Sequence, residues 1–247
     1  MGHAARLMGT FPFPFAQPHI TSALARRPRR AFRDPTPMPS LSQILEEHPP
    51  VLLLDAASTR IQAGLLSSGS PPQWRSSDEE AGVGVFRCLE DLGVEIDRIG
   101  AFAFCDGPGS ILGIRTTAMA LRMWAVLKPR PMYAYCSLAV VAQALARPDL
   151  AVIADARRGA WHHYTLESGL RRVAAADLAG EQVMPENFRH WAPLPEGVPT
   201  TSYRLESLLA LPTVAQADLF RSVQDPDAFL HEEPAYATWS PQIHRAP

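Results

Sequence analysis

The sequence predicts an α/β protein made of two related lobes, and three observations lead to this fold class. The stretch VLLLDAASTRIQAGLL gives an apolar strand that ends at Asp55, then a polar turn and a second strand. The stretch AVIADARRGAWHHYTL repeats this design, with Asp155 placed 100 residues after Asp55. Apolar residues at helical spacing follow the first hairpin. We therefore expect one lobe over residues 48–148 and a second over residues 149–247.

The segment before the first lobe, residues 1–47, is expected to be a disordered, basic and proline-rich extension. Residues 1–37 contain six arginines against the single acidic residue Asp34, and six prolines interrupt any periodic pattern. The prolines also argue against the amphipathic helix of an organelle transit peptide. Translation starting at Met38 is the simpler interpretation.

Composition and charge exclude several classes of protein. Residues 38–247 carry 17 basic and 24 acidic side chains, so this part of the chain is acidic and unsuited to binding nucleic acid on its own. No apolar stretch approaches the roughly 18 residues needed to cross a bilayer, so we expect no membrane role. Cys88, Cys105 and Cys136 lie far apart in apolar segments, which is typical of buried thiols in a reducing compartment such as the cytoplasm.

The first helix of the N-terminal lobe is expected over residues 78–92, with Val85, Phe86, Leu89 and Leu92 on a broad apolar face. The stretch CDGPGSILGIR follows a short buried strand and predicts a sharp turn, with Ser110 as the cap of the next helix. The turn has two interpretations. The exposed amides of the helix could hold an anion, or the turn is only a tight strand-to-helix connection.

The second helix, over residues 110–127, is apolar on nearly all sides. From Thr116 to Leu127 its only charged residue is Arg122. Such a helix must be covered, either by its own domain or by another protein. The residues alone leave both alternatives open.

Beyond this helix the pattern becomes weaker. A third helix is expected over residues 137–145. Prolines interrupt the chain after Leu166, with short helices expected near residues 204–211 and 214–223 and a final edge strand over 233–238.

Four motifs in order resemble the signature of the bacterial TsaB family, also called YeaZ. That signature is an apolar strand ending in Asp-Thr-Ser, then GPGSFTGLR, then a Ser-Leu pair opening a helix, then an Asp-Ala-Arg turn. The matching residues are Asp55, Ser58, Gly107, Pro108, Gly109, Ser110, Gly113, Arg115, Ser137, Leu138, Asp155, Ala156, Arg157 and Gly159, while Glu233, Pro234 and Tyr236 resemble the family's last strand. The likeness covers about half of the chain, from Val51 to about Leu166. Nine of these residues are the candidates for an anion-binding role: Asp55, Ser58, Gly107, Gly109, Ser110, Gly113, Arg115, Asp155 and Arg157.

The resemblance implies an actin-like, hexokinase-like fold of two related lobes and a non-catalytic role. TsaB-like proteins pair with the catalytic TsaD subunit, which is joined by the ATPase TsaE, to make threonylcarbamoyladenosine at adenosine 37 of tRNA. The resemblance implies no cofactor of the chain's own, with ATP and metal used by the partner subunits and tRNA met only through the complex. It implies a partner interface at Val85, Phe86, Leu89, Leu92, Ala118, Met119, Arg122, Met123 and Trp124. The sequence leaves open whether the chain also pairs with a second copy of itself.

The chain departs from the family pattern at the predicted turns. Ala56 and Ala57 replace Thr-Ser after the aspartate, and Ile111 and Leu112 replace Phe-Thr after the elbow. Thr117 stands where the family tends to have glycine. These changes make the region implied to face a partner bulkier and more apolar, so a divergent interface or a different partner is also consistent with the sequence.

The alternative function is an active enzyme of the same fold, either an ATP-dependent phosphotransferase or a metal-dependent, glycoprotease-like hydrolase. Phosphate in such a site must approach the backbone of the first hairpin turn, but Ala56 and Ala57 fill that turn. The metal site would need two histidines one helical turn apart, whereas His162 and His163 are adjacent and point to opposite faces of a strand. We therefore predict no catalytic residue and no metal ligand.

Overall fold

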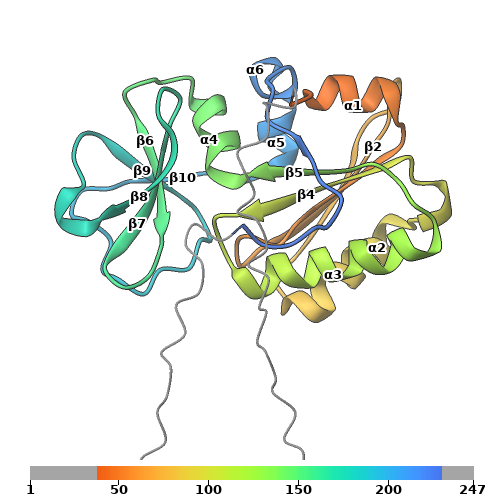
Figure 1. The fold of residues 1–247 in the computed structure, drawn as a ribbon, viewed down its shortest axis with the longest axis horizontal. Coiled ribbons are helices and arrows are strands. Elements are labelled where there is room, and N and C mark those ends of the chain that lie inside the picture. The colour runs from red at the N-terminus through yellow and green to blue at the C-terminus, as the bar shows by residue number, and fades with distance from the viewer. Residues whose placement is uncertain (1–37, 230–247) are drawn as a thin grey trace, which may run out of the picture. The chain divides into compact units, whose positions relative to one another are not determined.

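The computed structural model describes residues 38–229, which form two β-sheets with helices packed against them (Figure 1). The first sheet contains β1 (Val51–Asp55), β2 (Ile61–Leu66), β3 (Gln73–Ser77), β4 (Ala101–Gly107), β5 (Met132–Cys136) and β11 (Arg221–Ser222), in the order β11-β5-β4-β1-β2-β3. The second contains β6 (Ala151–Asp155), β7 (Ala160–Thr165), β8 (Gly169–Ala174), β9 (Gln182–Pro185) and β10 (Thr200–Thr201), in the order β10-β9-β6-β7-β8.

The two sheets repeat one topology. In each, the first strand pairs antiparallel with the second and the second antiparallel with the third. In each, the first strand also pairs parallel with the fourth and the fourth parallel with the fifth. The prediction of two related α/β lobes is therefore confirmed, and both predicted hairpins are present.

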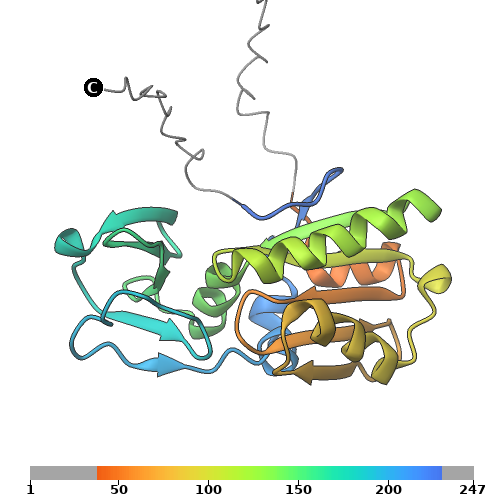
Figure 2. The ribbon, with the colours of Figure 1, turned by 90° about the horizontal axis from the view of Figure 1, so that it is seen from below.

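Six α-helices occur in the described residues: α1 (Leu41–Glu47), α2 (Ala81–Leu92), α3 (Ile111–Leu127), α4 (Ser137–Leu145), α5 (Leu205–Leu209) and α6 (Pro212–Ala215). Two short 3₁₀ helices also occur there, η1 (Ile96–Arg98) before β4 and η2 (Ala175–Asp177) before β9. Helices α2 and α3 lie side by side on one face of the first sheet (Figures 1 and 2).

The core explains why the first strand is apolar throughout. Leu52 and Leu54 point to the face covered by α2 and α3, whereas Val51 and Leu53 point to the opposite face, whose core includes residues of α1, α4 and α5. A strand that is covered on both faces needs apolar side chains in both directions.

Four predictions about the edges of the fold need correction or stay open. The extension was expected to reach residue 47, but residues 41–47 form α1, which a capping box of Ser40 and Gln43 begins. The helix expected over 214–223 is wrong after residue 215, because residues 221–222 pair with β5 instead. The strand expected over 233–238 and residues 1–37 lie outside the described residues, and the predicted lobe boundaries stay predictions.

The second lobe is the simpler copy. Between its third and fourth strands it has η2 where the first lobe has α2, and residues 186–199 replace α3 without a helix. Across residues 38–229, no helix combines the length and apolar character needed to span a membrane.

Candidate functional site

Asp55, at the end of β1, is buried and fully hydrogen-bonded. Its Oδ1 accepts the Ala57 N–H at 2.9 Å, and its Oδ2 accepts the hydroxyls of Tyr135 and Tyr203, each at 2.7 Å. Burial raises the pKa of the Asp55 carboxyl, and the two tyrosine hydrogen bonds oppose that rise. Only 1% of Asp55 is exposed, so the carboxylate contacts buried protein groups and not solvent.

The turn after Asp55 is covered by the glycine-proline-glycine elbow that precedes α3. The Ser110 N–H donates to the Ala57 carbonyl at 2.7 Å. A Cβ atom at Gly109 would collide with the Ala57 carbonyl, and one at Gly113 with the Ala56 carbonyl. Glycine is thus required for the close backbone approach, and the covered turn leaves no room for a phosphate beside these carbonyls.

Ser110 caps α3 as predicted. Its Oγ accepts the Gly113 N–H at 3.3 Å. The Ser110 N–H donates to the Ala57 carbonyl, so two of the backbone N–H groups at the start of the helix are hydrogen-bonded within the protein.

Asp155 forms the corresponding turn in the second lobe. Its Oδ1 accepts the Arg157 N–H, and its Oδ2 accepts the backbone N–H groups of Trp191 and Ala192 at 2.6 and 3.0 Å. Partial burial favours the neutral acid, but these backbone hydrogen bonds prevail and lower the pKa of Asp155. The Arg157 guanidinium lies 3.6 Å above the centre of the Trp191 ring.

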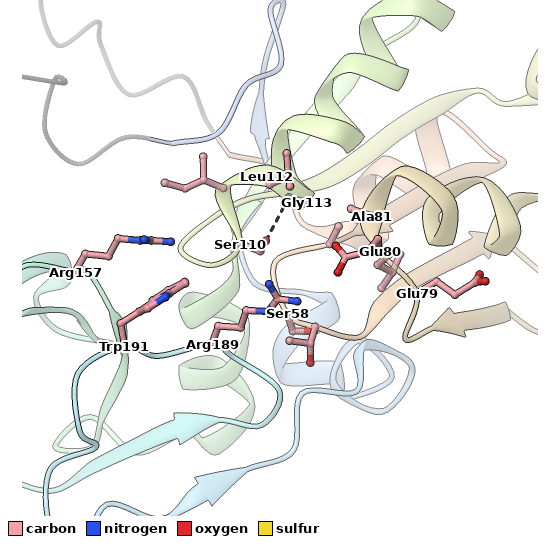
Figure 3. Close-up of a pocket in the computed structure, with 14 residues that line it drawn as sticks. Ser58, Glu79, Glu80, Ala81, Ser110, Leu112, Gly113, Arg157, Arg189 and Trp191 are labelled. Atoms are coloured by element: carbon pink, nitrogen blue, oxygen red, sulfur yellow. Dashed lines mark hydrogen bonds between the residues drawn. The ribbon is translucent and has the colours of Figure 1, made fainter. Parts of the chain in front are cut away.

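A cavity of about 250 Å³ lies between the two hairpin turns and the starts of α2 and α3 (Figure 3). It brings together four residues of the predicted motif set: Ser58, Ser110, Gly113 and Arg157. Sequence reasoning missed three further lining residues, Glu80, Arg189 and Trp191. Glu80 belongs to none of the motifs, and the other two follow Leu166, where no motif is recognisable.

The other predicted motif residues do not line this cavity. Asp55 is enclosed, Asp155 holds backbone amides, and Gly107 and Gly109 form the elbow. Arg115 pairs instead with Asp227, with 3.6 Å between Nε and Oδ1. Ser58 lines the cavity, but its hydroxyl donates to the Arg60 carbonyl at 2.7 Å.

The predicted partner interface is only partly on the surface. Five of its nine residues are buried in the core of the first lobe: Val85, Leu89, Leu92, Ala118 and Trp124. These five form the sides of α2 and α3 that pack on the sheet and on each other, and their part in a partner contact stays a prediction. Phe86, Met119 and Met123 are exposed, and Arg122 is half-buried.

Six large apolar residues of α3 are exposed, and four of them form one stripe, which we call the α3 face: Leu112, Met119, Met123 and Val126. Their spacing of seven, four and three residues places them on one side of the helix. Between 55% and 84% of each is exposed. The other two, Ile111 and Leu127, are the end residues of the helix. Val83 and Phe86 are exposed on the neighbouring helix α2.

A segment near the C-terminal end of the described residues is tied to α3 by charge. The Arg122 Nε lies 2.9 Å from Asp225 Oδ1, and Asp227 is within 3.7 Å of Arg122 and 3.6 Å of Arg115. The Phe229 N–H donates to the Asp106 carbonyl at 2.7 Å. Arg122 is therefore engaged within its own chain.

Within residues 38–229, no group of three histidine, cysteine, aspartate or glutamate side chains is placed to hold a metal ion. In the β6–β7 pairing, His162 lies opposite Ala154 and His163 opposite Ile153. Adjacent strand residues point to opposite faces.

Comparison with known proteins gives one family match. A family model described as "TsaD: tRNA N6-adenosine threonylcarbamoyltransferase" matches residues 75–217, which is more than half of the chain. No curated protein matches the sequence. Among solved structures, "YeaZ from Pseudomonas aeruginosa" is similar with a TM-score of 0.48 and 20% identity, over 65% of this chain and 88% of that one. A second structure, described as an uncharacterized protein with similarity to peptidase YEAZ from Pseudomonas aeruginosa, has a TM-score of 0.47 and 21% identity over the same shares.

Proposed function

The chain belongs to the TsaD family, and from this premise we propose that it is a TsaB-like, non-catalytic subunit. In this role it binds a TsaD-like catalytic subunit and supports the transfer of a threonylcarbamoyl group to adenosine 37 of tRNA. The motif resemblance in the first half of the chain selects the TsaB-like role within the family.

The observation that carries this proposal is the α3 face. An apolar stripe on a helix costs free energy in water, and burying it against a partner recovers about 25 cal/mol for each Å² removed from solvent. Met119 and Met123 lie at its centre, with 55% and 57% of each exposed. Methionine adapts its shape to a partner surface, which suits a docking role.

The lack of catalysis is supported by the state of Asp55. A carboxylate that orients a water or a metal must reach the cleft, but both oxygens of Asp55 accept hydrogen bonds from buried protein groups. The turn beside it is covered by Gly109 and Gly113. ATP and metal would then act on the partner subunits, including a TsaE-like ATPase, and tRNA would be met through the complex in the cytoplasm.

Co-purification tests the docking surface. The untagged TsaD homologue of the same cell should elute with the tagged chain and should be lost with Met119→Asp or Met123→Asp. Leu211→Asp is the matched control, because Leu211 is also an exposed apolar residue, 39% exposed, but lies between α5 and α6. Trp124→Asp does not serve, because burying a charge there would unfold the lobe.

Two results would overturn the proposal. One is retention of the homologue by both methionine variants at wild-type yield. The other is ATP hydrolysis by the purified chain alone. Self-association of the chain that both variants abolish, without any TsaD homologue bound, would assign the α3 face to a homodimer instead.

A further inference from the structure

We propose that the cavity between the two lobes binds one small oxyanion group, a phosphate or a carboxylate, between Arg157 and Arg189. This inference goes beyond the docking role, because it concerns a cavity that shares only Leu112 with the α3 face. The cavity measures about 250 Å³, which is large enough for such a group and a short substituent.

Two guanidinium groups converge on this cavity. Arg157 comes from the turn between β6 and β7, and Arg189 from the irregular segment before β10. In Figure 3 the Arg157 side chain points toward Ser110 at the start of α3, and the Arg189 side chain points toward Ser58 in the first hairpin turn. Among the described residues, no carboxylate pairs with the Arg189 guanidinium, so its donors are available to a ligand.

Arg157 is held in place before any ligand arrives. Its φ of 61° lies in the left-handed region, which a side chain other than glycine rarely adopts. Asp155 accepts the backbone N–H groups of both Arg157 and Trp191. It therefore holds the backbone of both residues of the stacked pair, in which the Arg157 guanidinium lies over the Trp191 ring. A cation fixed in this way loses little freedom when it binds an anion.

The opposite wall adds donors and sets a limit on charge. Within residues 38–229, the N–H groups of Ile111 and Leu112 have no acceptor, whereas those of Ser110 and Gly113 do, and both Ile111 and Leu112 line the cavity. Glu79 and Glu80 also line it, and their carboxylates repel anions. The charge of Glu79 is partly offset by Arg87, with 3.9 Å between Arg87 Nε and Glu79 Oε2. Two arginines against these two carboxylates favour a single oxyanion group over a chain of phosphates.

This site is separate from the covered hairpin turn. The carbonyls of Ala56 and Ala57 are in contact with the elbow, so the anion would lie at the mouth of the cleft and would not reach Asp55. We therefore expect the site to bind the anion without any chemical change to it.

Titration of the full chain with inorganic phosphate, and separately with acetate, tests the proposal. The readouts are Trp191 fluorescence, with Trp191→Phe as the blank, and the amide NMR shifts of Ile111 and Leu112. We expect saturable binding of at least one probe. Arg189→Gln and Arg157→Gln should each weaken it by about tenfold or more, the loss typical of one charge-assisted contact.

Two further variants separate this site from general surface charge. Glu80→Gln should tighten binding a few-fold, by removing a nearby negative charge. Arg171→Gln, on β8 and outside the cavity, should change nothing. The proposal fails if neither probe saturates, if Arg171→Gln weakens binding as much as Arg189→Gln, or if Glu80→Gln weakens it. The docking proposal survives each of these results, because the α3 methionines do not line the cavity.

Discussion

At the scale of single residues, Asp55 matches the sequence motif, but both of its carboxylate oxygens are hydrogen-bonded to buried protein groups. The aspartate at the end of the first strand was recognisable from the sequence. Its two tyrosine partners were not, because they come from 80 and 148 residues further along the chain. Only the fold brings these hydroxyls to the carboxylate.

Tyr203→Phe tests this buried cluster. The change removes one of two hydroxyl donors to Asp55 and should lower the free energy of unfolding by about 1–3 kcal/mol. Urea denaturation measures the difference. Tyr164→Phe is the control, because Tyr164 is only partly buried and its hydroxyl makes no hydrogen bond within the described residues 38–229. Equal losses in the two variants would contradict the role of Asp55.

Asp106 gives a pH dependence. Burial raises its pKa from 3.8 to about 6, against the opposing attraction of Arg221, whose Nη2 lies 2.6 Å from Oδ2. A carboxyl whose pKa is higher in the folded state binds protons more tightly there than in the unfolded chain. Its contribution to stability is therefore greatest below pH 4 and falls as the pH rises through 6.

The measurement is the free energy of unfolding of wild type and Asp106→Asn between pH 4 and 7. Relative to the variant, the wild type should lose about 1–3 kcal/mol over this range. A difference that stays constant, or that grows in favour of the wild type as the pH rises, would contradict the raised pKa.

At the scale of elements, α3 was predicted with nearly correct ends because its cap, Ser110, stands in the sequence. Its lack of a polar face could not reveal which side packs on the sheet. The core takes Ile114, Leu121 and Trp124, whereas Met119 and Met123 stay outside. This division depends on the direction in which the helix leaves the elbow, and for this reason the sequence alone could not show that Ala118 and Trp124 face the core.

The elbow itself is testable by adding a single carbon atom. Gly113→Ala places a Cβ against the Ala56 carbonyl and should destabilise the protein by about 1–3 kcal/mol. Gly82→Ala is the matched control, since Gly82 also lies in the first turn of a helix but a Cβ there meets nothing within 4 Å. The control should be neutral or gain up to about 1 kcal/mol, as alanine favours helix. Thermal unfolding of both variants decides, and a neutral Gly113→Ala would contradict the covered turn.

At the scale of the whole molecule, the duplication could be predicted because both hairpins keep their strand, aspartate and turn. The second lobe's departure from the first could not, because residues 186–199 follow no periodic pattern. That segment supplies Arg189 and Trp191, and so the cavity between the lobes was visible only in the fold. The segment after β10 also joins the lobes, because Gln62 bonds the backbone of Tyr203 and Leu205, each at 2.9 Å.

The central claim is that an apolar face of the first lobe docks a catalytic partner. The most direct measurement is calorimetric titration of the chain with its TsaD homologue at several temperatures and salt concentrations. Burial of the α3 face predicts a clearly negative heat capacity change of binding and an affinity that varies little with salt. A heat capacity change near zero, with an affinity that falls steeply as salt rises, would contradict the claim.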